Sequence, residues 1–543
     1  MTDPVSDNQA PEFAPRDLWV DDVALREAVA REGGGGFAER LAHYGRLAGG
    51  ELYALSFDAH RDRPRLRTHD RHGKRIDAVE FHPNYHAIMQ AAIENGVAGL
   101  SWREPLPGAH VARAALSYLH YQVEPGSSCP LTMTHAAVPV LAHEPRLRDW
   151  AQKAAAPRYD GRNRPIGDKH GITLGMGMTE RQGGSDVRAN ATVAVPLASD
   201  GEYGLSGHKW FFSAPMSDGF LVTAQAPGGL SCFLMPRWKP DGTRNTFRLL
   251  RLKDKLGDWS NASSEVEFDG AWAQRVGEEG RGIATILEMV MLTRLDCMLG
   301  SAGLMRMALA QALHHCRHRR AFGKRLVDQP LMRTVLADLA LDAEAATAFA
   351  IRVAGAVDRA RTDRQEAAFA RIATAIGKFW ICKRAVAVVN EAQECLGGNG
   401  YVEESLLPRL YRQAPLNSIW EGSGNIQCLD ALRALQREPE TGRALWTELS
   451  VAAGRNAAFD AAVERLHPAL HGSEAVDVGQ ARFFVASLAL TLQASVLLRA
   501  ASPMAEAFCD TRLGDGHGCG IAAGALTASA GLDVAIERSL PMQ

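Results

Sequence analysis

The sequence lacks the features of a secreted, metal-binding or membrane-spanning protein. Its nine cysteines are scattered, without CxxC or Cys/His ligand spacing, so we expect reduced thiols, no disulfide framework and no metal ion. The first residues carry no basic stretch followed by an apolar one, so we expect no secretion signal. The longest uncharged run of interest, between Arg482 and Arg499, has 16 residues, includes Thr491 and Gln493, and is short for a membrane span. These features predict a cytoplasmic protein, with no membrane partner and a buried helix in that run.

An excess of charge of one sign is also missing. The chain has 60 Lys and Arg residues and 62 Asp and Glu residues, which gives a formal net charge of −2. Contact with nucleic acid would therefore need a local basic patch. At 543 residues the chain exceeds the size at which a single hydrophobic core stops growing, so we expect several domains.

The pattern of apolar residues predicts four domains and an α+β fold. Residues 1–171 are predicted to be a helical domain, in which residues 1 to about 60 form a loosely structured lead-in rich in Pro, Gly and acidic residues. Short β-rich segments separated by turn residues predict a small β-barrel or β-sandwich domain at 172–282. Helical periodicity predicts an antiparallel bundle at 283–440 and an extra helical domain at 441–543.

A glycine-rich segment near the start of the β-domain is the first candidate site. It reads GMTERQGGSDVRA from Gly177 to Ala189. Its hydroxyl groups and exposed backbone N–H groups suit a phosphate or a polar ring edge. A glycine-rich hairpin turn explains the same spacing, and spacing alone favours the turn.

A second candidate site places a carboxylate beside an indole and two glycines. The segment Ser418–Gln427 reads SIWEGSGNIQ. A glutamate in so apolar a setting is a candidate general base, because desolvation raises its pKa toward neutrality. A glutamate followed by Gly-Ser-Gly is also a common helix start or turn, so the segment alone is ambiguous.

Taken together, the motifs resemble those of the acyl-CoA dehydrogenase family. Gly177–Ala189 matches the family's first signature at its constrained positions. The segment ECLGGNGY at Glu394–Tyr401 matches the second, with Gln413 in place of the usual acidic or Asn residue at its end. The resemblance covers roughly residues 80 to 435, and it implies an FAD cofactor and an acyl-CoA thioester substrate.

Further features are similar to the AidB-like, alkylation-response branch of that family. They are GHKWFFS at Gly207–Ser213, RLKDKLG at Arg251–Gly257, the segment IWEGSGNIQ, and the extra C-terminal helical domain. Ordinary members of the family lack that last domain.

The resemblance implies flavin contacts in the β-domain and beside the candidate base. Phe211 takes the position of the family's flavin-stacking Trp, because Trp210 comes one residue early. Alternation along a strand places at least one ring of Trp210, Phe211 and Phe212 in the core. For Trp420 two interpretations stay open: a ring that narrows the acyl cavity, or a core aromatic. The implied cofactor-binding residues are Met176, Met178, Thr179, Ser185, Phe211, Ser213, Trp420, Ser423 and Asn425.

Another set of residues resembles two segments that, in the family, contact the FAD of a neighbouring subunit. Arg319 and Phe322 match one of these segments, and Gly397 and Gly398 match backbone donors in the other. An arginine suits a pyrophosphate because its fork can bond two oxygens. A cofactor site shared between subunits implies a homotetramer built as a dimer of dimers.

Glu421 aligns with the family's catalytic base. The α-C–H of a thioester is a weak acid, and a positioned carboxylate must take its proton as hydride leaves the β-carbon. Some members carry the base on an earlier helix, just before an arginine; that position here is Thr293, next to Arg294, and a threonine cannot serve. A carboxylate that stabilises a helix N-terminus is the alternative interpretation of Glu421.

AidB-like proteins are associated with binding of duplex DNA, largely through the C-terminal domain. Residues 441–543 carry seven basic and ten acidic residues, a net charge of −3, which weakens that expectation here. The stretch from His314 to Arg325 is far more basic. The DNA-binding residues that we predict are Arg317, Arg320, Arg325 and Arg433.

Two alternative functions follow from the resemblance. The first is an FAD-binding protein of the DNA alkylation response that binds duplex DNA and keeps at most weak dehydrogenase activity. The second is a metabolic short- or branched-chain acyl-CoA dehydrogenase with Glu421 as base and no role on DNA. Trp420 and the branch-specific motifs favour the first, whereas an intact Glu421 favours retained chemistry.

Overall fold

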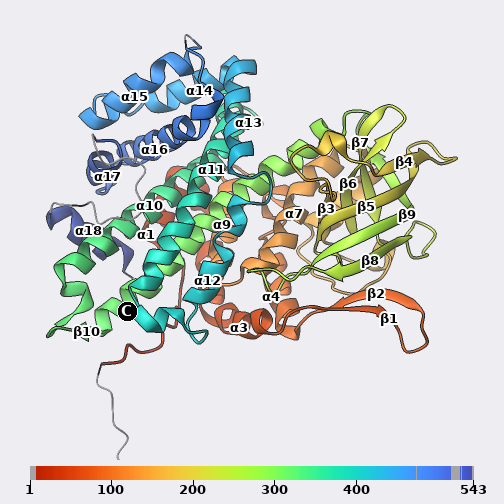
Figure 1. Ribbon diagram of the computed structural model, residues 1–543, viewed down its shortest axis with the longest axis horizontal. Helices are drawn as coiled ribbons and strands as arrows, with labels where there is room; N and C mark the ends of the chain where they lie inside the picture. Colours follow the sequence, from red (N-terminus) through yellow and green to blue (C-terminus); the bar gives the residue numbers. More distant parts are fainter. Residues whose placement is uncertain (1–7, 473, 515–525, 527–528, 541–543) are drawn as a thin grey trace, which may run out of the picture. The chain divides into compact units, whose positions relative to one another are not determined.

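Long helices and one β-sheet domain make up the computed structural model, which describes residues 8–472, 474–514, 526 and 529–540 (Figure 1). The chain divides into two units. Unit 1 consists of Met1–Gly50, Pro107–Gln122 and Arg294–Gln543, and unit 2 consists of Glu51–Leu106 and Val123–Thr293. The division falls within helix α9 (Gly282–His318). The α+β fold class predicted from the sequence is confirmed.

Unit 1 is helical and has α10 (Pro330–Arg359) and α11 (Arg364–Glu394) at its centre. Asp363 caps α11 by accepting hydrogen bonds from the backbone N–H groups of Gln365 and Glu366. Every side chain of α10 from residue 336 to residue 356 is buried. The other helices of this unit before the C-terminal region are α1 (Val23–Arg31), α2 (Ala38–Leu47), α6 (Ala109–Tyr121), α12 (Leu407–Gln413) and α13 (Gly424–Arg437).

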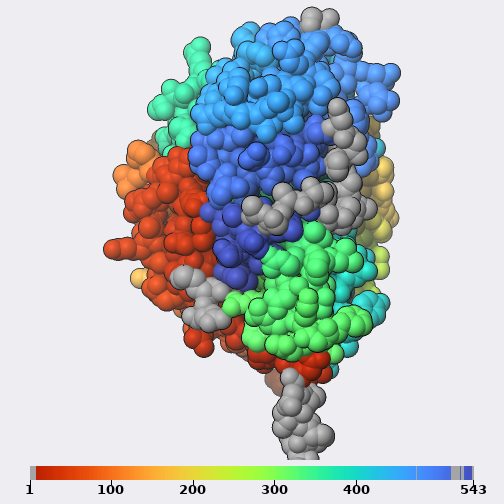
Figure 2. All heavy atoms as spheres, turned by 90° about the vertical axis from the view of Figure 1, so that its left-hand side faces the viewer, coloured from red at the N-terminus to blue at the C-terminus, as the bar shows by residue number. Residues whose placement is uncertain are grey.

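The C-terminal region of unit 1 is also helical. Its elements are α14 (Pro439–Ser450), α15 (Ala457–Leu470), α16 (Ala481–Arg499), α17 (Ala505–Arg512) and α18 (Ser529–Ser539). Figure 2 shows α18 lying between N-terminal residues and α10, and α18 contacts both α1 and α10. The predicted domain at 441–543 is therefore helical where the structure describes it; residues 473, 515–525, 527–528 and 541–543 lie outside the described part.

Helix α16 is the buried helix expected between Arg482 and Arg499, and 14 of its residues are buried. Among the described residues, the stretch Val478–Arg499 is long and apolar enough to cross a membrane by length and composition alone. In the protein, however, 78% of its most apolar window is buried. Packing against α10, α11 and α13 accounts for its apolar character.

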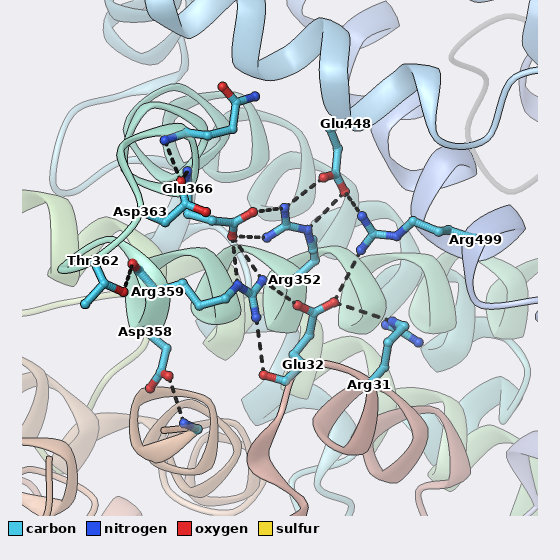
Figure 3. A network of polar contacts seen from close by, with 12 residues as sticks. Arg31, Glu32, Arg352, Asp358, Arg359, Thr362, Asp363, Glu366, Glu448 and Arg499 are labelled. Atoms are coloured by element: carbon cyan, nitrogen blue, oxygen red, sulfur yellow. Dashed lines mark hydrogen bonds and ion pairs between the residues drawn. The ribbon is translucent and has the colours of Figure 1, made fainter. Parts of the chain in front are cut away.

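A buried ionic network joins the C-terminal helices to the centre of unit 1 (Figure 3). Arg352 of α10 donates to both carboxylate oxygens of Glu366 on α11, at 2.8 Å each, and to those of Glu448 on α14, at 3.0 and 2.8 Å. Arg499, the last residue of α16, lies 3.0 Å from Glu448 and 3.5 Å from Glu32. Because α10 is buried, the charged side chain of Arg352 needs polar partners inside the protein, and Glu366 and Glu448 provide them.

Unit 2 contains a seven-stranded sheet built from β3 (Leu174–Gly177), β4 (Val193–Pro196), β5 (Glu202–Ser213), β6 (Gly219–Ala226), β7 (Gly229–Pro236), β8 (Phe247–Leu252) and β9 (Ser263–Val276). Strands β4, β5, β9, β7 and β6 pair in a closed ring, and β3 and β8 extend it from β6 and β9. The ring is a small barrel, so of the two architectures expected from the sequence the barrel is present. Its core is aromatic, with Phe212, Phe220 and Phe233 fully buried.

Unit 2 also contains α3 (Tyr53–Arg61), α4 (Pro83–Glu94), α5 (Leu100–Arg103), α7 (Pro125–Ala142) and α8 (Arg148–Ala155). A two-stranded hairpin, β1 (Arg65–His69) and β2 (Arg75–Glu80), lies between α3 and α4. The boundaries of the four predicted domains stay a prediction, because compactness divides the described chain differently, into two units.

The expectation of a loosely structured lead-in up to residue 60 is wrong for residues 23–61. They form α1, α2 and α3, with Leu25, Leu41 and Tyr44 fully buried. Among the glycines that suggested a loose segment, Gly34 has a packing role: a Cβ there would stand 2.8 Å from Val29. The eight described cysteines are buried and free, and Cys519 lies outside the described residues.

Candidate active site

Glu421 lies in a short loop between a 3-10 turn (Leu416–Ser418) and α13. Its φ angle is +59°, and that of Gly422 is +94°, so two successive residues are left-handed. This conformation is uncommon for a residue with a side chain and persists only where its surroundings hold it. The surroundings of Glu421 therefore bear directly on its role.

Three side chains of unit 1 hold the two carbonyl groups of this loop. Arg294 Nε donates to the Glu421 carbonyl at 3.0 Å, and Lys378 Nζ donates to the Gly422 carbonyl at 2.7 Å. Gln427 Nε2 donates to both carbonyls, at 3.1 and 3.0 Å. Lys378 and Gln427 are buried, so the backbone that carries the Glu421 side chain is fixed from the protein interior.

Arg294 is in turn held by charge. Its Nη1 lies 2.8 Å from Asp430 Oδ2, and Arg371 binds the other carboxylate oxygen at 2.9 Å. Thr293, the alternative position for a base, is buried and donates its hydroxyl to the Val290 carbonyl at 3.0 Å. A hydroxyl occupied in this way does not replace a carboxylate. The family resemblance had drawn attention to Arg294, and Gln427 is the last residue of the segment Ser418–Gln427, but no pattern marked Lys378, which is distant in the sequence.

Trp420 is half-buried, and its indole Nε1 donates to Asn417 Oδ1 at 3.0 Å. Asn417 is fully buried and donates to Ser301 at 3.2 Å. The ring is therefore fixed beside Glu421 by a buried amide, and its predicted contact with the cofactor stays a prediction.

Ser423 and Asn425 lie at the start of α13 and are both exposed. Ser423 is the N-cap residue and, within the described residues, makes no side-chain capping bond. Asn425 Oδ1 accepts a hydrogen bond from Arg482 of α16 at 3.1 Å. The helix start thus presents one hydroxyl and one amide next to the Glu421 loop.

In unit 2 the predicted flavin contacts lie on β3 and in the loop that follows it. Met176, Met178 and Thr179 are half-buried, and Ser185 is exposed. A Cβ at Gly184 would stand 2.5 Å from Thr179 Oγ1, so the loop can fold back on itself only with glycine there. The first signature therefore forms a tight turn, as one interpretation of its sequence expected. The same turn presents hydroxyl groups, so the other interpretation, a site for a phosphate or a polar ring edge, stays a prediction.

A fully buried ion pair anchors this loop to the barrel. Lys209 Nζ lies 2.8 Å from Glu180 Oε1 and also donates to the Thr223 carbonyl at 2.8 Å. Glu180 accepts further bonds from Thr192 Oγ1 at 2.6 Å and the Ala191 N–H at 2.7 Å. Burial lowers the pKa of Lys209 to about 8. Burial opposes the charge of Glu180 as well, but hydrogen bonds from Lys209 and Thr192 outweigh it and lower the Glu180 pKa.

A β-bulge explains how the three aromatics of β5 are arranged. The register with β9 shifts between Lys209 and Phe212. Phe212 is fully buried, which confirms that one of the rings is core, whereas Phe211 is 51% exposed. Lys253 Nζ lies 3.6 Å from the centre of the Trp210 ring and 4.7 Å from that of Phe211, so both rings face one cation.

We call Trp210, Phe211 and Lys253 the aromatic ledge. Ser213 lies at the end of the same strand, half-buried, with its hydroxyl 3.1 Å from that of Ser263. Sequence alignment singled out Phe211 alone; the bulge adds Trp210 to the exposed side.

The predicted intersubunit residues of unit 1 lie on two exposed loops. Phe322 is 98% exposed at the turn between β10 (Arg320–Ala321) and β11 (Lys324–Arg325), with a left-handed φ of +51°. Arg319 Nη1 donates to the Asn8 carbonyl at 2.6 Å. Gly397 and Gly398 are exposed, and a Cβ at either would meet nothing within 4 Å.

The predicted DNA-binding residues are accessible. Arg320, Arg325 and Arg433 are exposed, and Arg317 is half-buried near the end of α9. Arg325 pairs with Asp328 at 2.7 Å. No carboxylate among the described residues forms an ion pair with Arg317, Arg320 or Arg433. Their role as DNA contacts stays a prediction.

Comparisons with known proteins identify the family. Residues 8–161 match the model of the adaptive response protein AidB N-terminal domain, and residues 175–271 and 280–436 match the middle and C-terminal domains of acyl-CoA dehydrogenases. The chain is 49% identical over 500 residues to AidB of Escherichia coli (strain K12). The matched residues are 91% of this chain and 92% of that protein. The chain belongs to the AidB-like branch of the acyl-CoA dehydrogenase family.

Acyl-CoA dehydrogenases are FAD-dependent oxidoreductases, and this chain is of that enzyme type. Acyl-CoA dehydrogenase family member 11 of Caenorhabditis elegans is 32% identical over 412 residues, which are 73% of this chain and 66% of that protein. The crystal structure of C. elegans ACDH-11 in complex with C11-CoA superposes with a TM-score of 0.85 at 25% identity, covering 100% of this chain and 94% of that one.

The residues present in this AidB-like chain fit a flavin nucleotide. Unit 2 offers exposed aromatic surface at Phe211 and hydroxyl groups at Thr179, Ser185 and Ser213. Unit 1 offers glycine backbone with open space at Gly397 and Gly398. Stacking surface, hydroxyl groups and an open glycine backbone are the groups that an isoalloxazine ring and a pyrophosphate require.

Proposed function

We propose that this protein binds FAD and oxidises the Cα–Cβ bond of an acyl-CoA thioester, with Glu421 as the base. The observation that carries the proposal is the double left-handed loop at Glu421 and Gly422, whose carbonyls are held by Arg294, Lys378 and Gln427. Strain that is maintained by three interior side chains is typical of a functional position. A carboxylate that merely began a helix would not need it.

In this reaction one residue would act as the base and a separate set of residues would hold the cofactor. The Glu421 carboxylate takes the proton from the α-carbon of the thioester, and the pair of electrons left behind forms the new Cα=Cβ bond. When bound, FAD accepts the hydride that leaves the β-carbon. The residues that would hold it are Met176, Met178, Thr179, Ser185, Phe211, Ser213, Ser423 and Asn425, with Trp420 beside the base.

The substrate class is an acyl-CoA. A structural neighbour that covers this chain entirely binds C11-CoA, which supports a CoA thioester as the ligand. The fixed indole of Trp420 beside Glu421 supports a narrow acyl site, which favours short or branched chains. A panel of acyl-CoAs mixed anaerobically with the FAD-loaded protein measures this preference as flavin bleaching.

The decisive experiment is Glu421→Gln. We expect the rate of flavin reduction by the best acyl-CoA to fall by about 10²–10⁴-fold with FAD content unchanged, because only the base is lost. Glu440→Gln is the matched control, since Glu440 is an exposed carboxylate on α14. Unchanged reduction in Glu421→Gln would show that another group takes the proton.

We also propose that the protein is a homotetramer in which Arg319, Phe322, Gly397 and Gly398 reach a neighbour's FAD. The almost fully exposed Phe322 and the open glycine backbone support this. Arg319→Ala should then weaken FAD binding without altering the Glu421 loop. Sedimentation at several concentrations, with and without FAD, measures the assembly.

A second function, binding of duplex DNA with only weak dehydrogenase activity, is supported by the unpaired cations of the bundle. Arg317, Arg320 and Arg433 have no described ion-pair partner. Counterion release predicts that log affinity for a duplex falls linearly with log salt, by about 0.9 for each phosphate contacted. Binding that is insensitive to salt, or no binding, would contradict this function while leaving the dehydrogenase proposal intact.

A further inference from the structure

The β1–β2 hairpin of unit 2 is strongly basic and takes no part in the candidate active site. From Arg65 to Glu80 the hairpin carries five Lys and Arg residues and three carboxylates, a net charge of +2 with neutral histidines, in a chain whose total is −2. Charge concentrated in this way on one projecting element is the electrostatic footprint of a polyanion site. In Figure 1 the turn of the hairpin is its end farthest from α3 and α4.

One face of the hairpin is anchored, and the other is free. Val79 is buried in the barrel core and Leu66 packs against it. Burial alternates along β1, so that Arg65, Arg67 and His69 all lie on the opposite, exposed face. The side chains of Arg65 and Arg67 are 75% and 53% exposed.

The spacing of these cations suits a phosphate backbone. Successive residues on one strand face are about 6.8 Å apart, twice the rise per residue. Charges on one DNA strand are about 3.4 Å apart in projection on the axis, and the winding of the strand separates neighbouring phosphates further, so Arg65 and Arg67 can contact neighbouring phosphates. A β-bulge between Arg67 and His69 adds twist to the hairpin. Beyond the bulge, the tip adds exposed Arg71 and Lys74.

The hairpin suits duplex DNA better than a protein or RNA. Within the described chain no large hydrophobic side chain is exposed between residues 60 and 80, whereas protein interfaces have an apolar centre. A two-stranded β-ribbon fits the major groove of B-form DNA, and the deep, narrow groove of A-form RNA excludes it. The pairs Arg65–Asp62 and Arg67–Glu80 are both at 2.6 Å and exposed, so phosphates can displace these carboxylates.

We propose that the β1–β2 hairpin is a binding surface for duplex DNA, with Arg65, Arg67, Arg71 and Lys74 on the phosphates that border the major groove. The proposed function named DNA contacts only in unit 1. This surface lies in unit 2 and has its own anchoring and charge.

The experiment measures binding of a fluorescent 25-base-pair duplex to full-length, FAD-loaded protein across a salt series. The variant Arg65→Gln with Arg67→Gln should reduce the slope of log affinity against log salt by about two, and affinity at about 0.1 M salt by tens of fold. Arg65→Lys with Arg67→Lys should retain most of both. The control is Arg361→Gln with Arg364→Gln, the same change of charge at exposed positions elsewhere.

Each outcome bears on a separate claim. A hairpin variant that binds DNA like the control overturns this inference; if Arg317→Gln with Arg320→Gln then abolishes binding, the DNA function of unit 1 stands alone. No binding by the unchanged protein overturns both. If the hairpin variant loses binding to phosphatidylserine vesicles but retains DNA, the surface is for a membrane, and the proposal is wrong.

Discussion

Each unit of the protein uses a buried lysine to hold a segment of the candidate site, but the two lysines do so by different means. In unit 2, Lys209 pairs with the buried carboxylate of Glu180, and the pair anchors the signature loop to the barrel. In unit 1, Lys378 donates to the carbonyl of Gly422, whose backbone is left-handed. The first lysine compensates a charge, whereas the second maintains a conformation. Loss of the first should therefore appear as lost stability, and loss of the contacts made by the second as lost activity.

The largest effect should come from Lys209→Met, which leaves the Glu180 carboxylate buried without its cation. Removal of one partner of a buried pair costs about 3–5 kcal/mol of unfolding free energy. Adding Glu180→Gln should recover much of that loss, because no charge then remains to be buried. Lys239→Met is the control, since Lys239 forms an exposed pair with Asp241 at 3.3 Å. Denaturant unfolding measures all four proteins, and a double variant no better than the single one would argue against charge compensation.

Gly422→Ala tests whether the contacts that hold the Glu421 loop support activity. We call Arg294, Lys378 and Gln427, which hold the Glu421 and Gly422 carbonyls, the clamp. A Cβ at residue 422 would stand 2.7 Å from Gln427 Nε2 and 3.1 Å from Ile426, at a φ of +94°, so the clamp has to move. We expect flavin reduction by acyl-CoA to fall by about 100-fold, since a displacement of about 1 Å at a reacting group has that effect. Gly454→Ala has a similar φ of +76° but nothing within 4 Å, so it should cost about 1 kcal/mol of stability and no activity. Equal activities of the two variants would mean that the clamp does not position Glu421.

The contrast between the units also explains what could be predicted from the sequence. The helices of the bundle and the strands of the barrel follow from periodicity. Alternation along a strand predicted at least one ring of Trp210, Phe211 and Phe212 in the core, and Phe212 is such a ring. Glu421 and the glycine-rich signature could be singled out as candidates because each lies in a contiguous motif. The contacts that hold the Glu421 loop were not predicted, because Lys378 and Arg294 come from helices far away in the sequence and act on backbone carbonyls that carry no sequence signal.

One prediction was wrong because glycine occurs both in turns and where close packing leaves no room for a side chain. Glycines at 33–36 indicated a loose lead-in, yet Gly34 is present because α1 and α6 leave no room for a side chain. In Gly183–Gly184 the same residue type does mark a turn, which closes on Thr179. Composition cannot separate close packing from a turn, since both require only the absence of a Cβ. The bulge that adds Trp210 to the aromatic ledge is likewise a property of pairing with β9 and not of β5 alone.

The smallest effect concerns acid, which should weaken the aromatic ledge but not the Glu421 clamp. Hydrogen bonds from Arg251 and Lys253 lower the pKa of Glu265 to about 2, and Glu265 holds Lys253 against the two rings. In the unfolded chain this carboxyl titrates near 4.3. Its stabilisation is therefore full above that pH and is lost as the pH falls toward about 2.

The free energy of unfolding of wild type should exceed that of Glu265→Gln by under about 1 kcal/mol at pH 6, because the Arg251 side chain is 62% exposed and solvent screens its charge. The difference should shrink steadily from pH 5 to pH 2. Glu267→Gln, on the exposed side of the same strand, is the control. The clamp at Glu421 should show no such dependence, because its acceptors are backbone carbonyls, which do not titrate. A constant difference between wild type and Glu265→Gln across this range would mean that Lys253 is held over the rings without the charge of Glu265.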